Sequence, residues 1–230
     1  MSETGGKPQG RILNEVQFTS TKSENLHLLY AKNVLSKPTS FFVDLEKQVK
    51  WNTGDLAKVK LFGKWHNIPR KQAAYGDEGL SYRFSGNTIP AKPWIPCLQQ
   101  LRDELSELLQ HNFNFVLINR YKDGQDHIGY HKDDERELDP DAPIVSISLG
   151  QGRDFLLQHQ DSRGPQKKRD VPQVSILLEP NSMLLMMPPT NQFWFHSLPV
   201  RKSQPGVRIN LTFRVFKPEI AMRTSSSSRP

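Results

Sequence analysis

The sequence has a single cysteine, and it lacks both a long apolar segment and a secretory apolar region near its start. Cys97 is the one cysteine among 230 residues, so no disulfide can form within the chain. No apolar run approaches the roughly 18 residues that cross a bilayer. We therefore expect a protein of a reducing intracellular compartment that does not enter a membrane.

Charge is unevenly distributed along the chain. The net charge is +7, and residues 58–71 and 198–217 contain basic residues without an acid. Between them lies an acidic run, residues 133–141. This arrangement indicates a polyanion bound at the rim of a locally acidic pocket, whereas the alternative is a generically basic surface.

A short motif near the middle of the chain contains two potential metal ligands. His131 and Asp133 stand two residues apart, and His196 follows much later. In an extended segment, side chains at i and i+2 lie on one face and can bind one ion. Two imidazoles and a carboxylate form the facial triad that suits non-haem Fe(II). The motif predicts a redox metal site, although such spacing is common and the acidic run is also typical of a solvated loop.

Residues 207–216 form a strongly alternating segment that follows the second histidine. Apolar residues at every other position predict a strand with one buried face. Its other face carries Arg208, Asn210 and Arg214. A guanidinium binds a carboxylate through two hydrogen bonds, so the two arginines are candidate ligands for a dicarboxylate beside the metal.

Asn119 and Tyr121 form a similar pair at the end of the predicted strand 113–121. They stand two residues apart and share one face. Each one alone is typical of a polar surface, but together with the arginines they predict donors for a 2-oxo acid.

The chain reads as one domain of mixed composition. Thr39 or Ser40 is expected to cap a first helix, and a second helix is expected from Trp94 or Pro96 to Gln110. The second helix has a leucine stripe that predicts a core face, formed by Leu98, Leu101, Leu105 and Leu108. Short strands are expected at 113–121, 143–149, 153–159, 173–178, 183–187, 193–197 and 207–216. Many short strands favour a sandwich or jelly roll.

Residues 59–66 predict a hairpin with an unusual apolar tip. Leu61 and Phe62 stand at the turn beside Gly63, with Lys64 and other cations around them. An apolar tip next to cations is the combination that pushes between stacked bases. The alternative is that Phe62 packs into the core, as large apolar residues often do.

These segments together resemble a known family. They lie between Asp55 and Lys217 and read FGKWHNIPRKQ, YRFSG, KPWIP, FNFVLINRYKDG, DHIGYHKDDERE, DSRG, LLMM, FHSLPVRK and RINLTFR. The chain resembles the AlkB family of iron- and 2-oxoglutarate-dependent nucleic-acid dealkylases, in particular its members that repair duplex DNA.

The resemblance implies an α+β, mainly β fold. This is a double-stranded β-helix (jelly roll) core with N-terminal helices and a β-hairpin lid that recognises the nucleotide. The domain is expected over residues 31–217, with the lid at about 55–90 and the core at about 113–217. The polar composition of residues 1–30 and 218–230 predicts flexible tails.

The resemblance also implies an activity: oxidative demethylation of 1-methyladenine and 3-methylcytosine in double-stranded DNA, with Fe(II), 2-oxoglutarate and O2. Because the methyl group lies inside a duplex, the base must first leave the stack. A nuclear monomer is expected. We find no clear motif for a replication clamp in residues 1–30.

Residue roles follow from the same resemblance. The implied metal ligands are His131, Asp133 and His196. The implied 2-oxoglutarate contacts are Asn119, Tyr121, Arg208, Asn210 and Arg214, with the arginine for each carboxylate left open. The implied base contacts are Tyr82, Phe84, Ser85, Asp134 and Glu135, with the imidazole of His131 stacked on the base. The implied DNA contacts are Leu61, Phe62, Gly63, Lys64, Arg70, Gln72, Arg201 and Lys202.

Two positions depart from the family pattern. Gln158 and Pro165 stand where a basic residue would reach the complementary strand, although Lys167 and its neighbours can substitute. Two other functions remain possible from the sequence. One is a related oxygenase for RNA or single strands, and the other is a non-catalytic DNA-binding module of the same fold.

Overall fold

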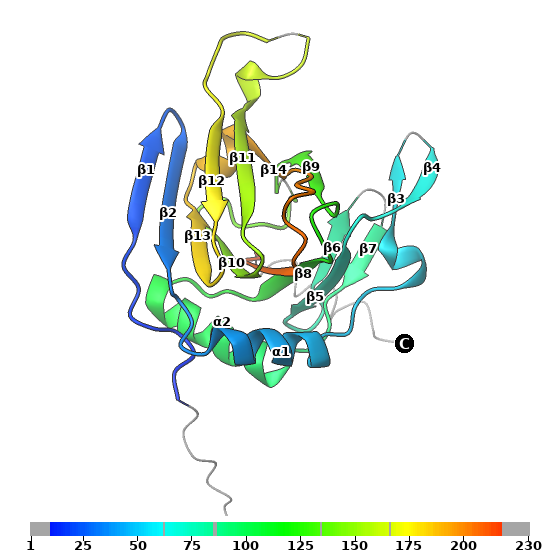
Figure 1. Ribbon diagram of the computed structural model, residues 1–230, viewed down its shortest axis with the longest axis vertical. Coiled ribbons are helices and arrows are strands. Elements are labelled where there is room, and N and C mark those ends of the chain that lie inside the picture. Colours follow the sequence, from blue (N-terminus) through cyan, green and yellow to red (C-terminus); the bar gives the residue numbers. More distant parts are fainter. Residues whose placement is uncertain (1–9, 62, 85–86, 134, 166, 218–230) are drawn as a thin grey trace, which may run out of the picture.

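The computed structural model describes residues 10–61, 63–84, 87–133, 135–165 and 167–217, and β-strands make up most of this part (Figure 1). The strands form two main sheets and two small hairpins. In the described residues, no helix has the length and apolar character that crossing a membrane requires.

The larger sheet has seven antiparallel strands in the order β1-β2-β13-β10-β15-β8-β5. In that order, their bounds are Thr19–Ser23, Leu26–Lys32, Ser182–Met186, Ile144–Gly150, Arg208–Arg214, Phe115–Tyr121 and Lys71–Gly76. Strands distant in the sequence are therefore neighbours, as a jelly roll requires.

The smaller sheet has four antiparallel strands in the order β12-β11-β14-β9. Their bounds are Val174–Leu178, Arg153–His159, Trp194–Leu198 and Ile128–His131. Leu157, Leu178 and Trp194 of this sheet pack in one buried cluster with Leu184 and Met186 of the larger sheet. The two sheets thus face each other across a core, and the mainly β jelly-roll fold is confirmed.

Helices α1 (Pro38–Gln48) and α2 (Pro96–Leu109) cover the other face of the larger sheet (Figure 1). Their buried residues share a cluster with Ile209, Leu211 and Phe213 of β15. The alternate residues of β15 line a cavity between the two sheets. Every residue of β15 is buried. Its apolar residues therefore face the helices, and its alternating polar residues face the cavity.

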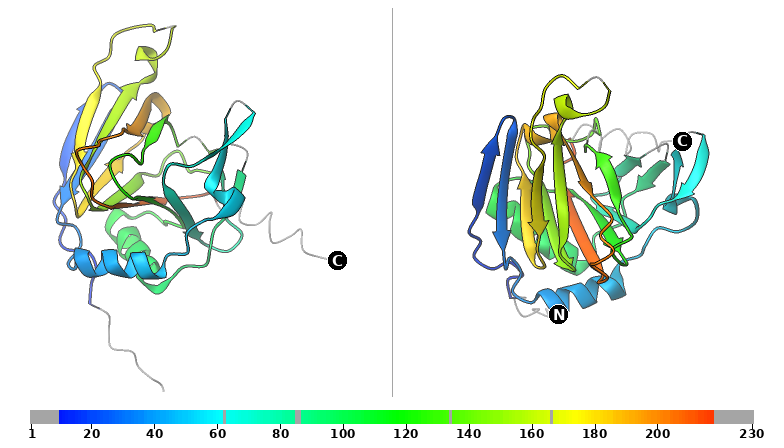
Figure 2. Two further views of the ribbon diagram at one scale, coloured as in Figure 1. Left: turned by 45° about the vertical axis from the view of Figure 1, so that its right-hand side comes forward. Right: turned by 45° about the horizontal axis from the view of Figure 1, so that its top comes forward.

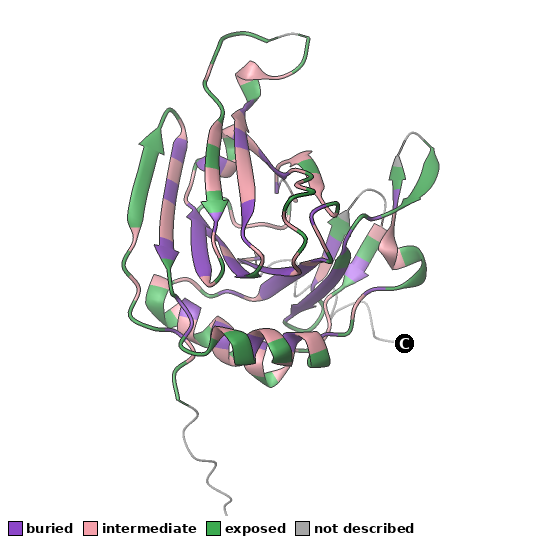
Figure 3. Ribbon diagram, in the orientation of Figure 1, coloured by how far each residue is buried: buried purple, intermediate pink, exposed green. Residues whose placement is uncertain are grey.

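The remaining elements lie at the edges of the sheets. One hairpin consists of β3 (Lys58–Leu61) and β4 (Lys64–Asn67), and a second of β6 (Ser81–Phe84) and β7 (Asn87–Pro90). The first hairpin projects from the body of the molecule in both views of Figure 2, and its β4 side chains are exposed (Figure 3). The short helices are η1 (Gly54–Ala57), η2 (Gln160–Ser162) and α3 (Thr190–Phe193).

Most predicted elements are confirmed. The seven strands expected from the sequence occur within two residues of their expected bounds, and α2 follows the predicted helix. The cap predicted for the first helix is wrong. Lys37 occupies the N-cap without a side-chain bond, and Pro38 begins the helix, because its fixed φ suits a first turn.

The predicted N-terminal tail is too long. Residues 19–32 form strands β1 and β2, and Leu26 and Leu28 are buried in the core. The polar composition concealed this because β1 is an edge strand whose side chains are all exposed. The lid was expected at about residues 55–90, but β5 within this range belongs to the larger sheet. The remaining tail predictions fall on residues 1–9 and 218–230, outside the described part.

The leucine stripe of α2 gives a stability prediction. Leu105 is fully buried, whereas Leu108 is 43% exposed, contrary to the predicted stripe. We expect Leu105→Ala to lower the free energy of unfolding by about 2–5 kcal/mol. Leu108→Ala should change it by less than about 0.5 kcal/mol. Urea unfolding measures both, and equal losses would contradict the orientation of this helix.

Candidate metal centre

The structure brings the three predicted metal ligands together. His131 ends β9 and pairs in register with His196 of β14, with ring centroids 4.2 Å apart. Asp133 follows two residues after His131. One potential ligand atom from each residue lies within 4.8 Å of the others. Pairing of β9 with β14 therefore brings His196 to the His131–Asp133 motif.

Both imidazoles favour the neutral form, which is the form that binds a metal. Burial lowers the pKa of His196 to about 3, with a further contribution from neighbouring His131. Burial also lowers the pKa of His131, against the opposing effect of Asp133. Nδ1 of His131 donates to the carbonyl oxygen of Gly129 at 2.9 Å, so Nε2 is left with its lone pair.

Asp133 supplies an ionised carboxylate. Burial opposes its ionisation, but Arg214 and the two histidines outweigh burial and lower its pKa to about 2. Nη2 of Arg214 lies 2.7 Å from the Asp133 Oδ1. Two neutral imidazoles and one carboxylate match the donor set of a 2-His-1-carboxylate iron site. Nδ1 of His196 is buried and has no hydrogen-bond partner among the described residues.

The polar face of β15 lies beside this triad in the same cavity. Arg208 and Asn210 pair in register with Tyr121 and Asn119 of β8, so the predicted cosubstrate residues form one patch. Arg208 donates from Nη2 to Asn210 Oδ1 at 2.7 Å and to Ser148 Oγ at 2.9 Å. Its guanidinium carbon lies 5.5 Å from the centre of the Tyr121 ring.

The two arginines differ in their partners. Arg208 is 2% exposed and forms no ion pair with an acid among the described residues, and burial lowers its pKa to about 10. Arg214 contacts Asp133 and lies 3.9 Å from Glu135. These carboxylates raise the pKa of Arg214 although burial opposes this. A buried cation without an anion is costly, so Arg208 fits an anionic ligand.

Arg70 lines the cavity, and Gln72 is buried beside Asn119. Arg70 is 9% exposed and donates from Nε to Asn119 Oδ1 at 2.8 Å. Gln72 is 3% exposed and donates to the same oxygen at 3.0 Å. Gln72 is paired with Asn119 across β5 and β8, which turns its side chain inward. Both side chains are thus largely buried, and their contact with DNA stays a prediction.

The predicted base contacts lie only partly within the described residues. The ring of Tyr82 is buried beneath Arg214, 5.4 Å from its guanidinium carbon, and lines the same cavity as His131. Glu135 is half-buried nearby. The predictions for Leu61, Phe62, Phe84, Ser85 and Asp134 concern side chains outside the described part.

The other predicted DNA contacts lie on the surface. Gly63 and Lys64 are exposed on the first hairpin, and the φ of Gly63 is +79°, a value that favours glycine. Lys202 is exposed, and Arg201 is half-buried in an ion pair with Asp154. Gln158 is one of the two positions that differ from the family pattern. Its Nε2 donates to the carbonyl oxygen of Ser162, which stabilises the turn after β11.

Sequence reasoning missed Arg153. This residue is fully buried and donates to the carbonyl oxygens of Asp123, Asp126 and Pro199. It thereby ties two loops at the end of the cavity near Tyr121. No sequence signal identifies it, because a single arginine at the start of a strand is typical of an exposed position.

Comparisons with known proteins agree with this geometry. The family model described as the 2OG-Fe(II) oxygenase superfamily matches residues 27–214. The solved structure of OsALKBH1 has a TM-score of 0.52 at 19% identity, covering 84% of this chain and 100% of that one. At this identity the likeness concerns the fold alone.

Curated relatives are more similar. The DNA oxidative demethylase ALKBH2 of Mus musculus is 56% identical over 177 residues, which are 77% of this chain and 74% of the relative. The protein of the same name in Homo sapiens is 58% identical over 173 residues, 75% of this chain and 66% of the relative. The alkB homolog 3 dioxygenase of Mus musculus is 34% identical over 190 residues, 77% of this chain and 65% of the relative. The chain therefore belongs to the AlkB family of the 2OG-Fe(II) oxygenase superfamily, and it is a dioxygenase that depends on Fe(II), 2-oxoglutarate and O2.

Proposed function

We propose that the enzyme demethylates N-alkylated bases, 1-methyladenine and 3-methylcytosine, in double-stranded DNA. The observation that carries this proposal is a buried cavity lined both by the His-Asp-His triad and by Arg208, which forms no ion pair with an acid among the described residues. An exposed basic hairpin at the edge of the molecule supports a nucleic-acid substrate. Two relatives named DNA oxidative demethylase ALKBH2 support DNA as the substrate.

His131, Asp133 and His196 are the residues that would hold Fe(II). With 2-oxoglutarate and O2, the metal would supply the oxidation chemistry: one oxygen atom would enter succinate as 2-oxoglutarate loses CO2, and the other would hydroxylate the N-methyl group, which would leave as formaldehyde. The protein contributes neutral imidazoles, an ionised carboxylate and a buried setting that excludes water.

Different arginines bind the two carboxylates of 2-oxoglutarate in this proposal. Arg208 takes the carboxylate farther from the metal, because it pairs with no acid in the described part of the chain and Ser148 already orients its guanidinium. Arg214, which contacts the metal ligand Asp133, takes the carboxylate nearer the metal. Asn119, Tyr121 and Asn210 supply further polar contacts.

The alkylated base leaves the duplex and enters beside the metal. Tyr82, Phe84, Ser85, Asp134 and Glu135 surround it, and His131 stacks on it. Because alkylation at these positions makes the base cationic, nearby carboxylates favour the lesion over an ordinary base. Phe62, which lies between β3 and β4 in the sequence, fills the gap in the duplex.

The surroundings of the reaction are also part of the proposal. Gly63, Lys64, Arg201 and Lys202 contact the DNA backbone, and the protein acts as a monomer in the nucleus. The names of the relatives support a DNA substrate, and the exposed positions of Gly63, Lys64 and Lys202 support contact with its backbone.

Product analysis tests the reaction. The enzyme is loaded with Fe(II) and 2-oxoglutarate without oxygen, and O2 and a methylated duplex are then added. Succinate formed with an unmethylated duplex is subtracted as background. We expect one formaldehyde for each remaining succinate. The lesion supplies the only methyl group that can be released as formaldehyde. Equal formaldehyde from unmethylated duplex, or none from methylated duplex, would refute the proposal.

Replacement of Arg208 tests the cosubstrate site. We expect Arg208→Met to raise the KM for 2-oxoglutarate about 30-fold or more, because loss of one partner of a buried charge pair costs at least about 2 kcal/mol. Arg201→Met, the same change outside the cavity, should leave this KM unaltered. Steady-state kinetics with saturating DNA measures both, and similar values for the two variants would contradict the assignment.

Replacement of Phe62 tests the duplex preference. We expect Phe62→Ala to lose about tenfold more activity on duplex than on single-stranded substrate. A base that leaves a duplex creates a gap for the phenylalanine to fill, whereas a single strand has no such gap. Trp65→Ala changes an exposed aromatic residue of the same hairpin and should affect both substrates equally. Equal losses for Phe62→Ala would remove the wedge role and favour an enzyme of single strands or RNA.

A further inference from the structure

The backbone of Asp133 lies outside the strand ladders. Strand β9 ends at His131, and Asp133 follows in coil although it is only 4% exposed. Buried backbone N–H and C=O groups need hydrogen-bond partners. Neighbouring strands do not supply them here, so another group must.

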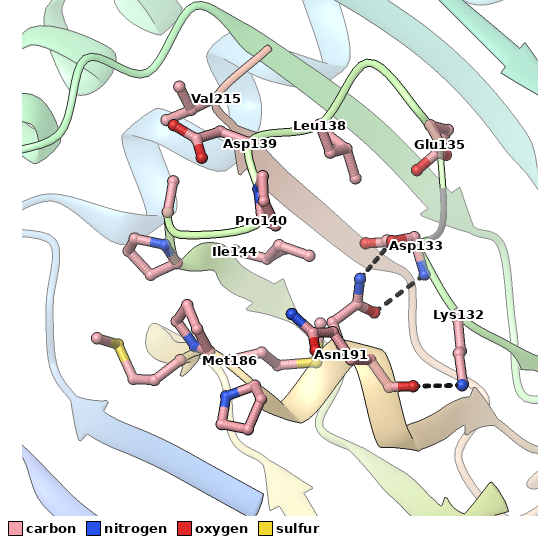
Figure 4. A pocket seen from close by; sticks show the side chains of 16 residues that line it. Lys132, Asp133, Glu135, Leu138, Asp139, Pro140, Ile144, Met186, Asn191 and Val215 are labelled. Carbon is pink, nitrogen blue, oxygen red and sulfur yellow. Dashed lines mark hydrogen bonds between the residues drawn. The ribbon is translucent and has the colours of Figure 1, made fainter. Parts of the chain in front are cut away.

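Asn191 supplies both partners. Its Oδ1 accepts a hydrogen bond from the Asp133 N–H at 3.1 Å, and its Nδ2 donates to the Asp133 carbonyl oxygen (Figure 4). One side chain thus fixes both sides of the residue that carries the carboxylate. Arg214 contacts the carboxylate itself, so backbone and side chain are held separately.

The element that carries Asn191 is itself anchored. Asn191 belongs to α3, and neighbouring Thr190 is fully buried. The Thr190 hydroxyl accepts from the His27 N–H at 2.8 Å and donates to the His27 carbonyl oxygen at 3.1 Å. Strand β14, which contains His196, follows α3 directly. The helix can therefore fix Asp133 relative to His196.

A second contact joins the segment before Asp133 to helix α3. Nζ of Lys132 donates to the carbonyl oxygen of Gln192 at 2.5 Å (Figure 4). It also donates to Oε1 of Gln160 at 3.0 Å. Without Asn191, the segment would stay near α3, but the backbone of Asp133 would no longer be fixed.

We infer that Asn191 is a positioning residue of the metal centre, holding Asp133 so that its carboxylate faces His131 and His196. The inference rests on the proposed role of Asp133 as a metal ligand. Side chains that orient metal ligands commonly contribute about 10- to 100-fold to metal affinity.

A cavity beside Asn191 indicates that its replacement is compatible with folding. Asp133, Ile144, Met186 and Asn191 are among its lining residues, and its volume is about 310 Å³ (Figure 4). Water in this cavity can satisfy the Asp133 N–H and C=O when the amide is removed. The hydrogen bonds are then replaced, but the fixed geometry is lost.

The chain offers a matched control at Asn181. Its Oδ1 accepts from the Leu35 N–H at 2.8 Å, and its Nδ2 donates to the Leu35 carbonyl oxygen at 3.1 Å. This is the same two-way amide contact, made on a residue that is not part of the metal centre. The φ of Asn181 is +58°, so alanine there is also strained. Asn181→Ala should therefore lose at least as much stability as Asn191→Ala.

Binding of Mn(II) alone to the metal-free full chain tests the inference. We expect Asn191→Ala to raise the Kd for Mn(II), measured by electron paramagnetic resonance, at least about tenfold. Asn181→Ala should bind Mn(II) like the original protein. Thermal melting of both variants separates loss of stability from loss of affinity.

The possible outcomes are distinct. An unchanged Mn(II) Kd in Asn191→Ala, or an equal loss of affinity in Asn181→Ala, would overturn the inference. A failure of the original protein to bind Mn(II) would instead refute the metal role of the triad. If Asn191→Ala does not fold, Asn191→Ser retains one polar atom and is measured in its place. An unchanged Kd in that variant overturns the inference equally.

Discussion

The ion pair between Arg214 and Asp133 is the contact on which the site depends. Arg214 belongs to β15 of the larger sheet, and Asp133 follows β9 of the smaller sheet, so the pair joins the two layers. Their side chains are 3% and 4% exposed. Removing one partner of such a buried pair typically costs about 3–5 kcal/mol, because the other charge is left uncompensated. The same contact keeps the carboxylate ionised beside two neutral imidazoles.

Strand β15 connects this chemistry to the stability of the fold. Ile209, Leu211 and Phe213 pack against the helices, while Arg208 and Arg214 enter the cavity between the sheets. A shift of register by one residue would exchange the two faces. Pairing with β8 on one side and β10 on the other fixes the register, so the main core and the arrangement of the arginines are established together.

Local rules explain which parts of the site were predictable. His131 and Asp133 share a face because they stand two residues apart, whereas their meeting with His196 depends on pairing of β9 with β14 and was inferred from the family resemblance. The inward direction of Gln72 depends on pairing of β5 with β8, which no local pattern reveals. Asn191 was missed for the same reason, since its contact with Asp133 spans 58 positions in the sequence. Edge strand β1 was missed because it has no apolar face.

The pairing of β9 with β14 has a consequence for the movement of the molecule. Strand β9 is the outer strand of its sheet, and only His131 and Ile128 are registered against β14, with an irregularity between the two pairs. Few backbone bonds therefore resist its separation, in contrast to the seven registered pairs between β8 and β15. Opening β9 from β14 therefore breaks fewer backbone hydrogen bonds than opening β8 from β15, and amide hydrogens of β9 should exchange with solvent before those of β15. Because β9 ends at His131, such opening disturbs a metal ligand before it disturbs the arginines of β15.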